Sequence, residues 1–174
     1  MRIYKDGSFI EDGWKEIGDD EPIAPGSEAI IVSLKRWQAE PEIKSRGNVG
    51  VLVRAGEEPD VEADGLLSLP VIVITFPKFT DGRGYSLARL LRERYGFKGE
   101  IRATGEVLLD QIPLMLRVGF DAFAISHQPT IAALERGHLP GLDLSYQRPA
   151  AARRIYSTTL RYSGGERGDG AGHA

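Results

Sequence analysis

The sequence predicts an α/β fold with a mostly parallel sheet of repeated β-α units. Apolar runs start near residues 49, 71, 100 and 122, so the strand starts lie 22 to 29 residues apart, which is the spacing of strand–helix units. An earlier run at 29–32 raises the number of candidate parallel strands to five. Because a closed barrel of this kind needs eight strands, we expect a half-barrel (TIM-like) or an open Rossmann-like sheet.

The chain opens with a predicted hairpin. Asp6-Gly7 is a strong signal for a tight turn, and it lies between short runs at 2–4 and 8–10 that alternate weakly. A second signal of the same kind follows at Asp12-Gly13. We therefore expect a small N-terminal hairpin at the edge of the domain.

The next predicted elements are a helix and a second strand. Ser33 follows the run at 29–32 and is placed to cap a helix over 34–46. Pro41 lies inside this segment, so we expect the helix to be cut into two pieces. A strand at 49–53 comes next.

Residues 71–105 form the central predicted βαβ unit. The run at 71–75 is almost entirely β-branched, which is typical of a strand buried on both faces. An amphipathic helix over 85–95 ends at Gly96, and another strand starts at Glu100. Such crossovers are nearly always parallel, so the polar loops after both strands lie at one edge of the sheet. That carboxyl edge is where α/β proteins carry their sites.

The last predicted units follow the same scheme. Proline is tolerated in the first turn of a helix, so Pro113 lets a helix start at Gln111 with Asp110 as its N-cap. A strand at 122–125 and a helix at 129–136 come next.

Beyond residue 139 the periodic pattern dissolves. Alternation at 142–146 predicts an edge strand, and the segment 163–174 (SGGERGDGAGHA) predicts a disordered tail. We therefore expect a single α/β domain over residues 1–162.

Composition excludes several kinds of site. The formal net charge is −3, which gives no electrostatic support to general binding of nucleic acid or anionic membranes. There is no cysteine, which excludes disulfides, a thiol nucleophile and cysteine-ligated zinc or iron–sulfur clusters. No segment approaches the roughly 18 apolar residues needed to span a bilayer, so we expect a soluble, cytoplasmic protein.

The loop at 78–85 is the first candidate site. Glycines just before a helix let backbone N–H groups face an anion, and the helix dipole adds roughly half a positive charge. Lys78 and Arg83, with the backbone of Gly82 and Gly84, therefore suit a sulfate, phosphate or carboxylate. The alternative is a turn that requires positive φ and carries two solvated charges.

Arg102 and Thr104 belong to the neighbouring strand and its exit. A charged residue on a strand buried on both faces needs a partner or a pocket. We therefore expect Arg102 to complete the anion site or to pair with a carboxylate. The candidate partners are Glu100, Glu106 and Asp110.

Groups able to move protons lie at the same edge. Tyr85 is a donor at a helix start, or else a packed aromatic residue. Asp110 is an N-cap or a general base, and Gln111 orients a ligand or caps. His127 follows a strand end, where an imidazole suits the role of an acid or a base, unless it is an ordinary surface histidine. The candidate catalytic residues are thus Lys78, Tyr85, Asp110 and His127, and no metal-ligand spacing is present.

A specific resemblance covers residues 76–123. Through the patterns F-x-D-G-R-G-Y-S and R-A-T-G-[DE]-V-x-x-D-Q, this stretch resembles an uncharacterised bacterial family, domain of unknown function 934. The resemblance extends over most of the chain and weakens in the hairpin and the tail. It implies an oxidoreductase involved in assimilatory sulfite or sulfate reduction. The residues it singles out are Phe79, Asp81, Gly82, Arg83, Gly84, Tyr85, Ser86, Arg102, Gly105, Asp110 and Gln111.

Two classes of function remain. Sulfite reduction needs a redox cofactor, and a chain without cysteine is not the catalytic haemoprotein. The first class is an oxidoreductase or accessory protein with an oxyanion site, its cofactor unknown. The second is a non-catalytic subunit that docks on a sulfite-reducing enzyme.

Two geometries would separate these classes. A buried pocket floored by Arg83 and Arg102 favours the enzyme, whereas a flat edge with exposed Tyr85 and Phe79 favours docking. The edge strands of an incomplete barrel need covering, so we also expect a homodimer.

Overall fold

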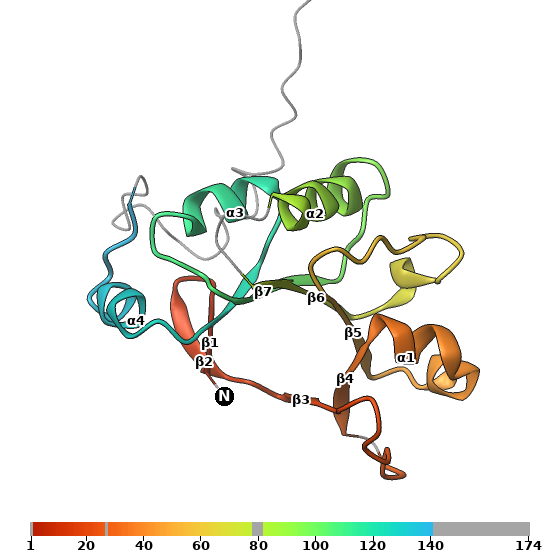
Figure 1. Cartoon of the computed structure of the whole chain (residues 1–174). Helices are drawn as coiled ribbons and strands as arrows, with labels where there is room; N and C mark the ends of the chain where they lie inside the picture. Colours follow the sequence, from red (N-terminus) through yellow and green to blue (C-terminus); the bar gives the residue numbers. More distant parts are fainter. Residues whose placement is uncertain (1, 27, 78–81, 141–174) are drawn as a thin grey trace, which may run out of the picture.

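The computed structural model describes residues 2–26, 28–77 and 82–140, which form one curled sheet with helices around its outside (Figure 1). The strands are Arg2–Lys5 (β1), Ser8–Glu11 (β2), Trp14–Glu16 (β3), Ala29–Ser33 (β4), Val49–Val53 (β5), Val71–Phe76 (β6), Glu100–Gly105 (β7) and Ala122–Ile125 (β8). The α-helices are Leu34–Ala39 (α1), Arg83–Glu93 (α2), Ile112–Val118 (α3) and Gln128–Glu135 (α4). None of the helices in these ranges is long and apolar enough to cross a membrane.

The sheet is mixed, which corrects the prediction of a mostly parallel sheet. Its strand order is β2-β1-β8-β7-β6-β5-β4-β3. Neighbours from β8 to β3 pair in parallel, but β1 is antiparallel to both β2 and β8. The predicted hairpin forms because Asp6 and Gly7 adopt the positive φ values (50° and 84°) of a tight turn. It was expected at the margin of the domain, yet it supplies two strands of the main sheet.

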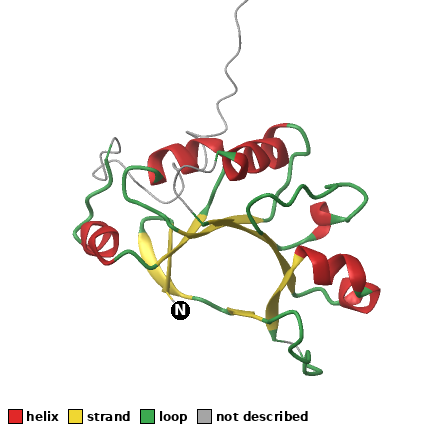
Figure 2. Ribbon diagram, viewed as in Figure 1, coloured by secondary structure: helices red, strands yellow, loops and turns green. Residues whose placement is uncertain are grey.

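The sheet curls until its two edges approach one another, as in a half-barrel. The edge strands β2 and β3 are consecutive in the chain, and only Asp12 and Gly13 separate them. The three Cα–Cα steps across this connection cover at most about 11 Å, so the edges must lie close together. Figure 2 shows the resulting ring of strands with the helices outside it. We call the face under the helices the outer face and the concave face the inner face.

A regular series of β-α units is not confirmed. The connection from β5 to β6 contains no α-helix, only a 3₁₀ turn at Leu66–Ser68. This connection includes Gly56 and Gly65, both at positive φ, and Pro59. Glycine and proline are poor helix residues, so the chain passes from β5 to β6 through turns and not through an α-helix.

Several local predictions are confirmed. The strands at 49–53 and 122–125 have the predicted bounds. The hydroxyl of Ser33 accepts a hydrogen bond from the backbone N–H of Arg36 (3.1 Å) and caps α1. Pro41 divides the helical segment, since a 3₁₀ helix at Pro41–Ser45 follows α1.

The predicted cap of α3 is wrong. Its N-cap is Gln111, and the helix starts at Ile112. Gln111 closes a turn on Leu108, because its N–H donates to the Leu108 carbonyl (3.1 Å) and its side-chain oxygen accepts from the Leu108 N–H (3.3 Å). This turn keeps Asp110 outside the cap position. The predictions for 142–146 and 163–174 lie outside the described residues, and the single domain over 1–162 stays a prediction.

The two faces of the sheet bury different amounts of apolar surface. The outer face and the helices share one large cluster that includes Ile72, Phe76, Leu91 and Ile101. The inner face has two small clusters, one around Val73 and one around Ile3, Ala122 and Ala124. The outer face is therefore the main core.

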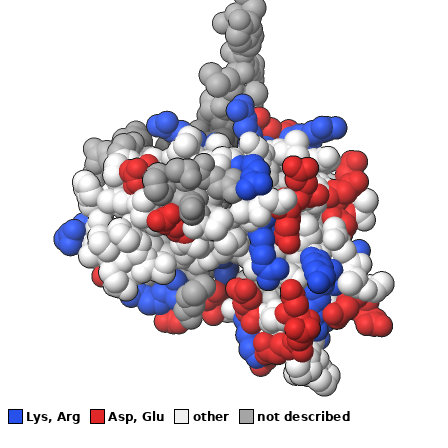
Figure 3. All heavy atoms as spheres, viewed as in Figure 1, with Lys and Arg blue, Asp and Glu red and all other residues white. Residues whose placement is uncertain are grey.

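Charges on the outside of the molecule are interspersed. On the face in Figure 3, acidic and basic side chains lie among one another. Arg89 and Glu93 pair at 2.9 Å, but each side chain is 65% exposed. Such solvated pairs contribute roughly 0–1 kcal/mol, so they do not define the fold.

Candidate functional site

The start of α2 lies at the carboxyl edge, as the sequence predicts. Gly82 is the N-cap with φ −72°, so it does not use the positive φ that the alternative interpretation required. Gly84 lies inside the first turn, and a Cβ there would come within 2.6 Å of the Phe76 ring. Gly84 therefore allows α2 to pack closely on β6. Lys78, Phe79 and Asp81 lie outside the described residues.

Arg83 reaches from α2 toward the loop after β5. Its guanidinium lies against Gly56, where an added Cβ would sit 3.2 Å from Nη1. Gly56 has φ +88°, so an L-residue would be strained there in any case. Ser86 donates its hydroxyl hydrogen bond back to the carbonyl of Gly82 (3.4 Å). The carboxyl edge thus has a charged group that lies against glycine backbone.

Tyr85 and Asp110 lie within electrostatic range of each other. The Tyr85 ring packs edge-on against Phe76, with centroids 5.3 Å apart. Burial raises the pKa of the Tyr85 phenol, and the negative charge of Asp110 raises it further. A phenol is protonated near neutral pH even at its ordinary pKa, and the raised pKa moves ionisation of Tyr85 further from that range, so the hydroxyl can act as a hydrogen-bond donor.

The exits of β6 and β7 place two hydroxyls side by side on the inner face. Thr75 and Thr104 are register partners, and the Thr75 oxygen is buried without a hydrogen-bond partner within the described ranges. Gly105 follows at φ +92°, where a Cβ would overlap the Phe76 carbonyl. That carbonyl accepts the N–H of Glu106 (2.7 Å), which turns the chain away from the sheet.

Gln111 and His127 are held by local contacts. Gln111 binds the turn before α3, as described above. His127 is the N-cap residue of α4, and its Nδ1 lies 2.8 Å from the hydroxyl oxygen of Thr130. Both residues follow the carboxyl ends of strands, as predicted, but each contacts its own helix start.

Arg102 is not at the same place as Arg83. Arg83 begins a helix on the outer face, whereas the side chain of Arg102 points to the inner face and is 2% exposed. Arg102 is a register partner of Val73 and Ala122. A pocket floored by both arginines is therefore not present in the described part of the chain.

Two carboxylates hold the guanidinium of Arg102. Nη1 donates to both oxygens of Asp12 (2.9 and 3.0 Å), and Nε donates to Glu100 (2.9 Å). Glu100 also pairs with Lys5 at 2.6 Å. We call Lys5, Asp12, Glu100 and Arg102 the inner network.

Asp12 is the member of the inner network that sequence reasoning missed. Pairing of Arg102 with Glu100 was an expected alternative, and a carboxylate two residues away on the same strand face is readable from the sequence. Asp12 lies 90 residues from Arg102, at a position that resembles an ordinary turn. Only the curl of the sheet brings it in, so no local signal identifies it.

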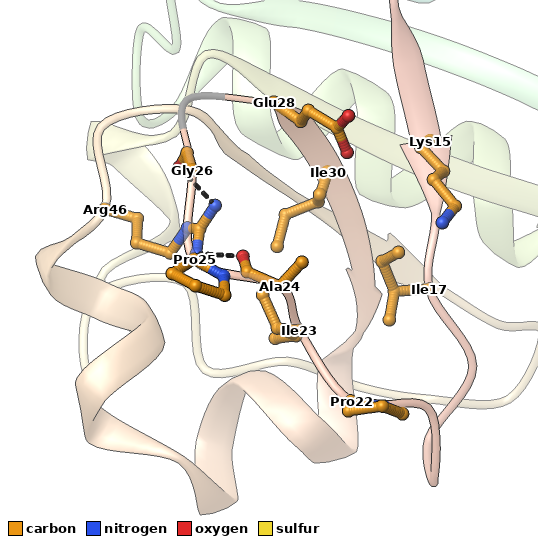
Figure 4. Close-up of a pocket in the computed structure, with 10 residues that line it drawn as sticks. All are labelled: Lys15, Ile17, Pro22, Ile23, Ala24, Pro25, Gly26, Glu28, Ile30 and Arg46. Carbon is orange, nitrogen blue, oxygen red and sulfur yellow. Dashed lines mark hydrogen bonds between the residues drawn. The ribbon is translucent and has the colours of Figure 1, made fainter.

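A cavity of about 340 Å³ lies away from the carboxyl edge (Figure 4). It opens at the amino ends of β4 and β5. Arg46 fixes one side of it by donating hydrogen bonds to the carbonyls of Ala24 (3.3 Å) and Gly26 (2.9 Å). The lining residues are Lys15, Ile17, Pro22, Ile23, Ala24, Pro25, Gly26, Glu28, Ile30 and Arg46. None of the sequence-predicted site residues is among them.

A comparison with models of known protein families shows which family this chain belongs to. Residues 50–156 match the model described as "Bacterial protein of unknown function (DUF934)". The chain belongs to the DUF934 family. The resemblance seen in the sequence is thereby confirmed at the level of the family. No curated protein matches the chain.

The DUF934 match contains every sequence-predicted site residue, from Lys78 to His127. It also contains Glu100 and Arg102. Lys5 and Asp12, the other half of the inner network, lie before its first residue. The inner network therefore joins a segment inside the DUF934 match to one outside it.

Proposed function

We propose that this protein is an accessory protein of assimilatory sulfite or sulfate reduction that binds a small oxyanion at the carboxyl edge. The observation that carries the proposal is the position of Arg83, which is exposed at the start of α2 and lies against Gly56. A helix start with a neighbouring guanidinium suits an oxyanion, because backbone N–H groups and the charge act together.

An oxidoreductase role is the second form of this proposal. Tyr85 supports it, because the pKa of its phenol is raised by burial and by Asp110. A phenol that stays protonated can donate to a bound oxyanion. His127 is a further proton-moving group in this scheme, although its contact with Thr130 also suits a structural role.

A non-catalytic docking subunit is the alternative function. Two observations favour it: Arg83 and Arg102 are on opposite faces of the sheet, and the described cavity lies at the opposite ends of the strands. In this scheme the carboxyl edge contacts a sulfite-reducing enzyme. A homodimer and a cytoplasmic location also stay predictions, and the first loses part of its basis because β2 and β3 lie close together.

The test is thermal unfolding of the purified chain with sulfite, sulfate, phosphate, NADPH and flavins. A ligand at 100 times its Kd adds about 2.7 kcal/mol to the free energy of unfolding. We expect a shift with an oxyanion that Arg83→Ala removes and Arg89→Ala, on the same helix, retains. A shift that survives in Arg83→Ala contradicts the edge site. If no ligand shifts the transition, the docking function replaces the binding function.

A further inference from the structure

The segment 8–16 is the least buried part of the sheet. It consists of β2, Asp12-Gly13 and β3, and we call it the flap. None of its residues is fully buried; Phe9, Asp12 and Trp14 are half-buried and the others are exposed. The flap is nevertheless the piece that joins one edge of the sheet to the other.

The flap is anchored by buried residues at both ends and by a carboxylate in the middle. Before it, Ile3 and Tyr4 of β1 are buried; after it, Ile17 is buried and bonds through its N–H to Ile31 (2.9 Å). Between these anchors, the side chain that reaches deepest is that of Asp12, which is 4% exposed although the residue as a whole is half-buried. Backbone pairing of β2 with β1 and of β3 with β4 holds the two sides of the flap, and the Asp12 carboxylate is the charged contact that holds its middle on the inner face.

The Asp12 carboxylate balances one of the two positive charges of the inner network, and Glu100 balances the other. The inner network contains two cations, Lys5 and Arg102, and two anions, Asp12 and Glu100. When Asp12 leaves, the remaining three residues carry one net positive charge. Nη1 of Arg102 then lacks the two oxygen acceptors that it has in the closed flap.

The flap contacts the inner face through the Asp12 ion pair and through Trp14, which packs against the apolar cluster around Val73. The inner face has two small apolar clusters, and Arg102 lies between Val73 of one and Ala122 of the other. Charges that are paired when buried are well solvated when exposed, so a buried ion pair adds little net stability. Such a contact specifies the closed position of the flap and still allows another anion to replace the Asp12 carboxylate.

We propose that the Asp12 carboxylate takes the position at Arg102 that a small external anion can also bind. Displacement of Asp12 opens the flap and gives a carboxylate or inorganic oxyanion access to Arg102. The anion takes the acceptor position of the Asp12 oxygens at Nη1, and an anion with a single negative charge, such as acetate, restores neutrality to the inner network. This site is separate from the edge around Arg83, so it goes beyond the proposed function and does not depend on it.

The absence of native cysteine allows a direct test by thiol labelling. Ala122 on the inner face and Ala103 on the outer face are both 0% exposed, so Ala122→Cys and Ala103→Cys form a matched pair. Asp12→Ala is added to each, and Glu11→Ala, an exposed neighbour, is the control for loss of one negative charge. We expect Asp12→Ala to accelerate labelling of the inner-face thiol at least about tenfold, with the outer-face thiol and the Glu11→Ala control unchanged.

Anion displacement is tested in the Ala122→Cys chain with Asp12 intact. Sulfate and acetate are compared with sodium chloride at equal ionic strength, which separates oxyanion from carboxylate and both from screening. We expect saturable acceleration by at least one of the two, unaffected by Arg83→Ala. In Asp12→Ala the same anion should raise the melting temperature, and this effect should vanish when Arg102→Gln is added.

Three results would overturn the proposal. They are an unchanged labelling rate of the inner-face thiol in Asp12→Ala, equal acceleration of the inner-face and outer-face thiols, and no anion effect beyond that of chloride. If a cysteine variant does not fold, acrylamide quenching of Trp14 in the unaltered chain replaces the labelling, because the other tryptophan, Trp37, is only 3% exposed. Quenching must then increase with the anion, and unchanged quenching overturns the proposal.

Discussion

The outer and inner faces of β7 are made by alternate residues of one strand, yet different forces hold them. On the outer face, Ile101 and Ala103 join the large apolar cluster under the helices. On the inner face, Glu100 and Arg102 belong to the inner network, and Thr104 lies beside Thr75. The outer face is therefore stabilised by burial of apolar area, whereas the inner face depends on charges that must be matched one by one.

The largest expected effect is on the inner face. Arg102→Ala leaves the buried Asp12 carboxylate without its partner, so we expect the free energy of unfolding to fall by about 3–5 kcal/mol. The double variant Asp12→Leu with Arg102→Met should recover most of this loss, because an apolar pair needs no charge matching. Urea unfolding measures both. A double variant as unstable as the single one would contradict the account.

The next effect concerns packing on the outer face. Gly84→Ala places a methyl group against the Phe76 ring, and we expect a loss of about 1–3 kcal/mol from overpacking. The control is Gly82→Ala, two residues earlier, where no atom of the described residues lies within 4 Å of the added Cβ. It should change stability by no more than about 0.5 kcal/mol. Equal effects of the two changes would show that α2 does not pack closely on β6.

A smaller effect of opposite sign is expected beside Phe76. Thr75→Val removes a buried hydroxyl that has no partner within the described residues, so we expect a gain of about 1 kcal/mol. Thr104→Val is the control, since its hydroxyl is not among those buried without a partner. Chemical denaturation checks both variants. A loss of stability in Thr75→Val would mean that the hydroxyl has a partner in solution.

The smallest effect is a pKa change at the carboxyl edge. Burial, and then the charge of Asp110, raise the pKa of Tyr85 above 10.0. Asp110→Asn should lower this pKa. The ultraviolet titration of Tyr85 is the difference between a protein and its Tyr85→Phe variant, and it is measured with and without Asp110→Asn. The folded state holds this proton after the unfolded chain loses it, so Tyr85 should lower stability as pH rises above about 10. An unchanged titration of Tyr85 in Asp110→Asn would show that the charge of Asp110 does not act on the phenol.

The sequence could predict what depends on local chemistry. Buried strands such as 49–53 are apolar runs, Ser33 is a recognisable cap, and Pro41 limits a helix wherever it occurs. The start of α2 and the exit of β7 also lie at one edge, because β6 and β7 are parallel. The need of Arg102 for a partner followed from burial alone.

The sequence could not predict what depends on closure of the sheet. Asp12-Gly13 has the composition of a turn, and nothing nearby shows that it meets β7. The separation of Arg83 from Arg102 has a different cause: a strand predicted as buried on both faces does not reveal which face a given side chain takes. Gly84 resembled a phosphate loop because close helix packing and anion binding both require glycine.

Amide hydrogen exchange of the intact chain, of Asp12→Ala and of Glu11→Ala tests the central claim most directly. If the Asp12–Arg102 pair holds the flap closed, residues 8–16 lose protection in Asp12→Ala alone, while α2 and β6 keep theirs. If the flap shows the same protection in all three proteins, the inner network does not hold the edges of the sheet together and the account is wrong.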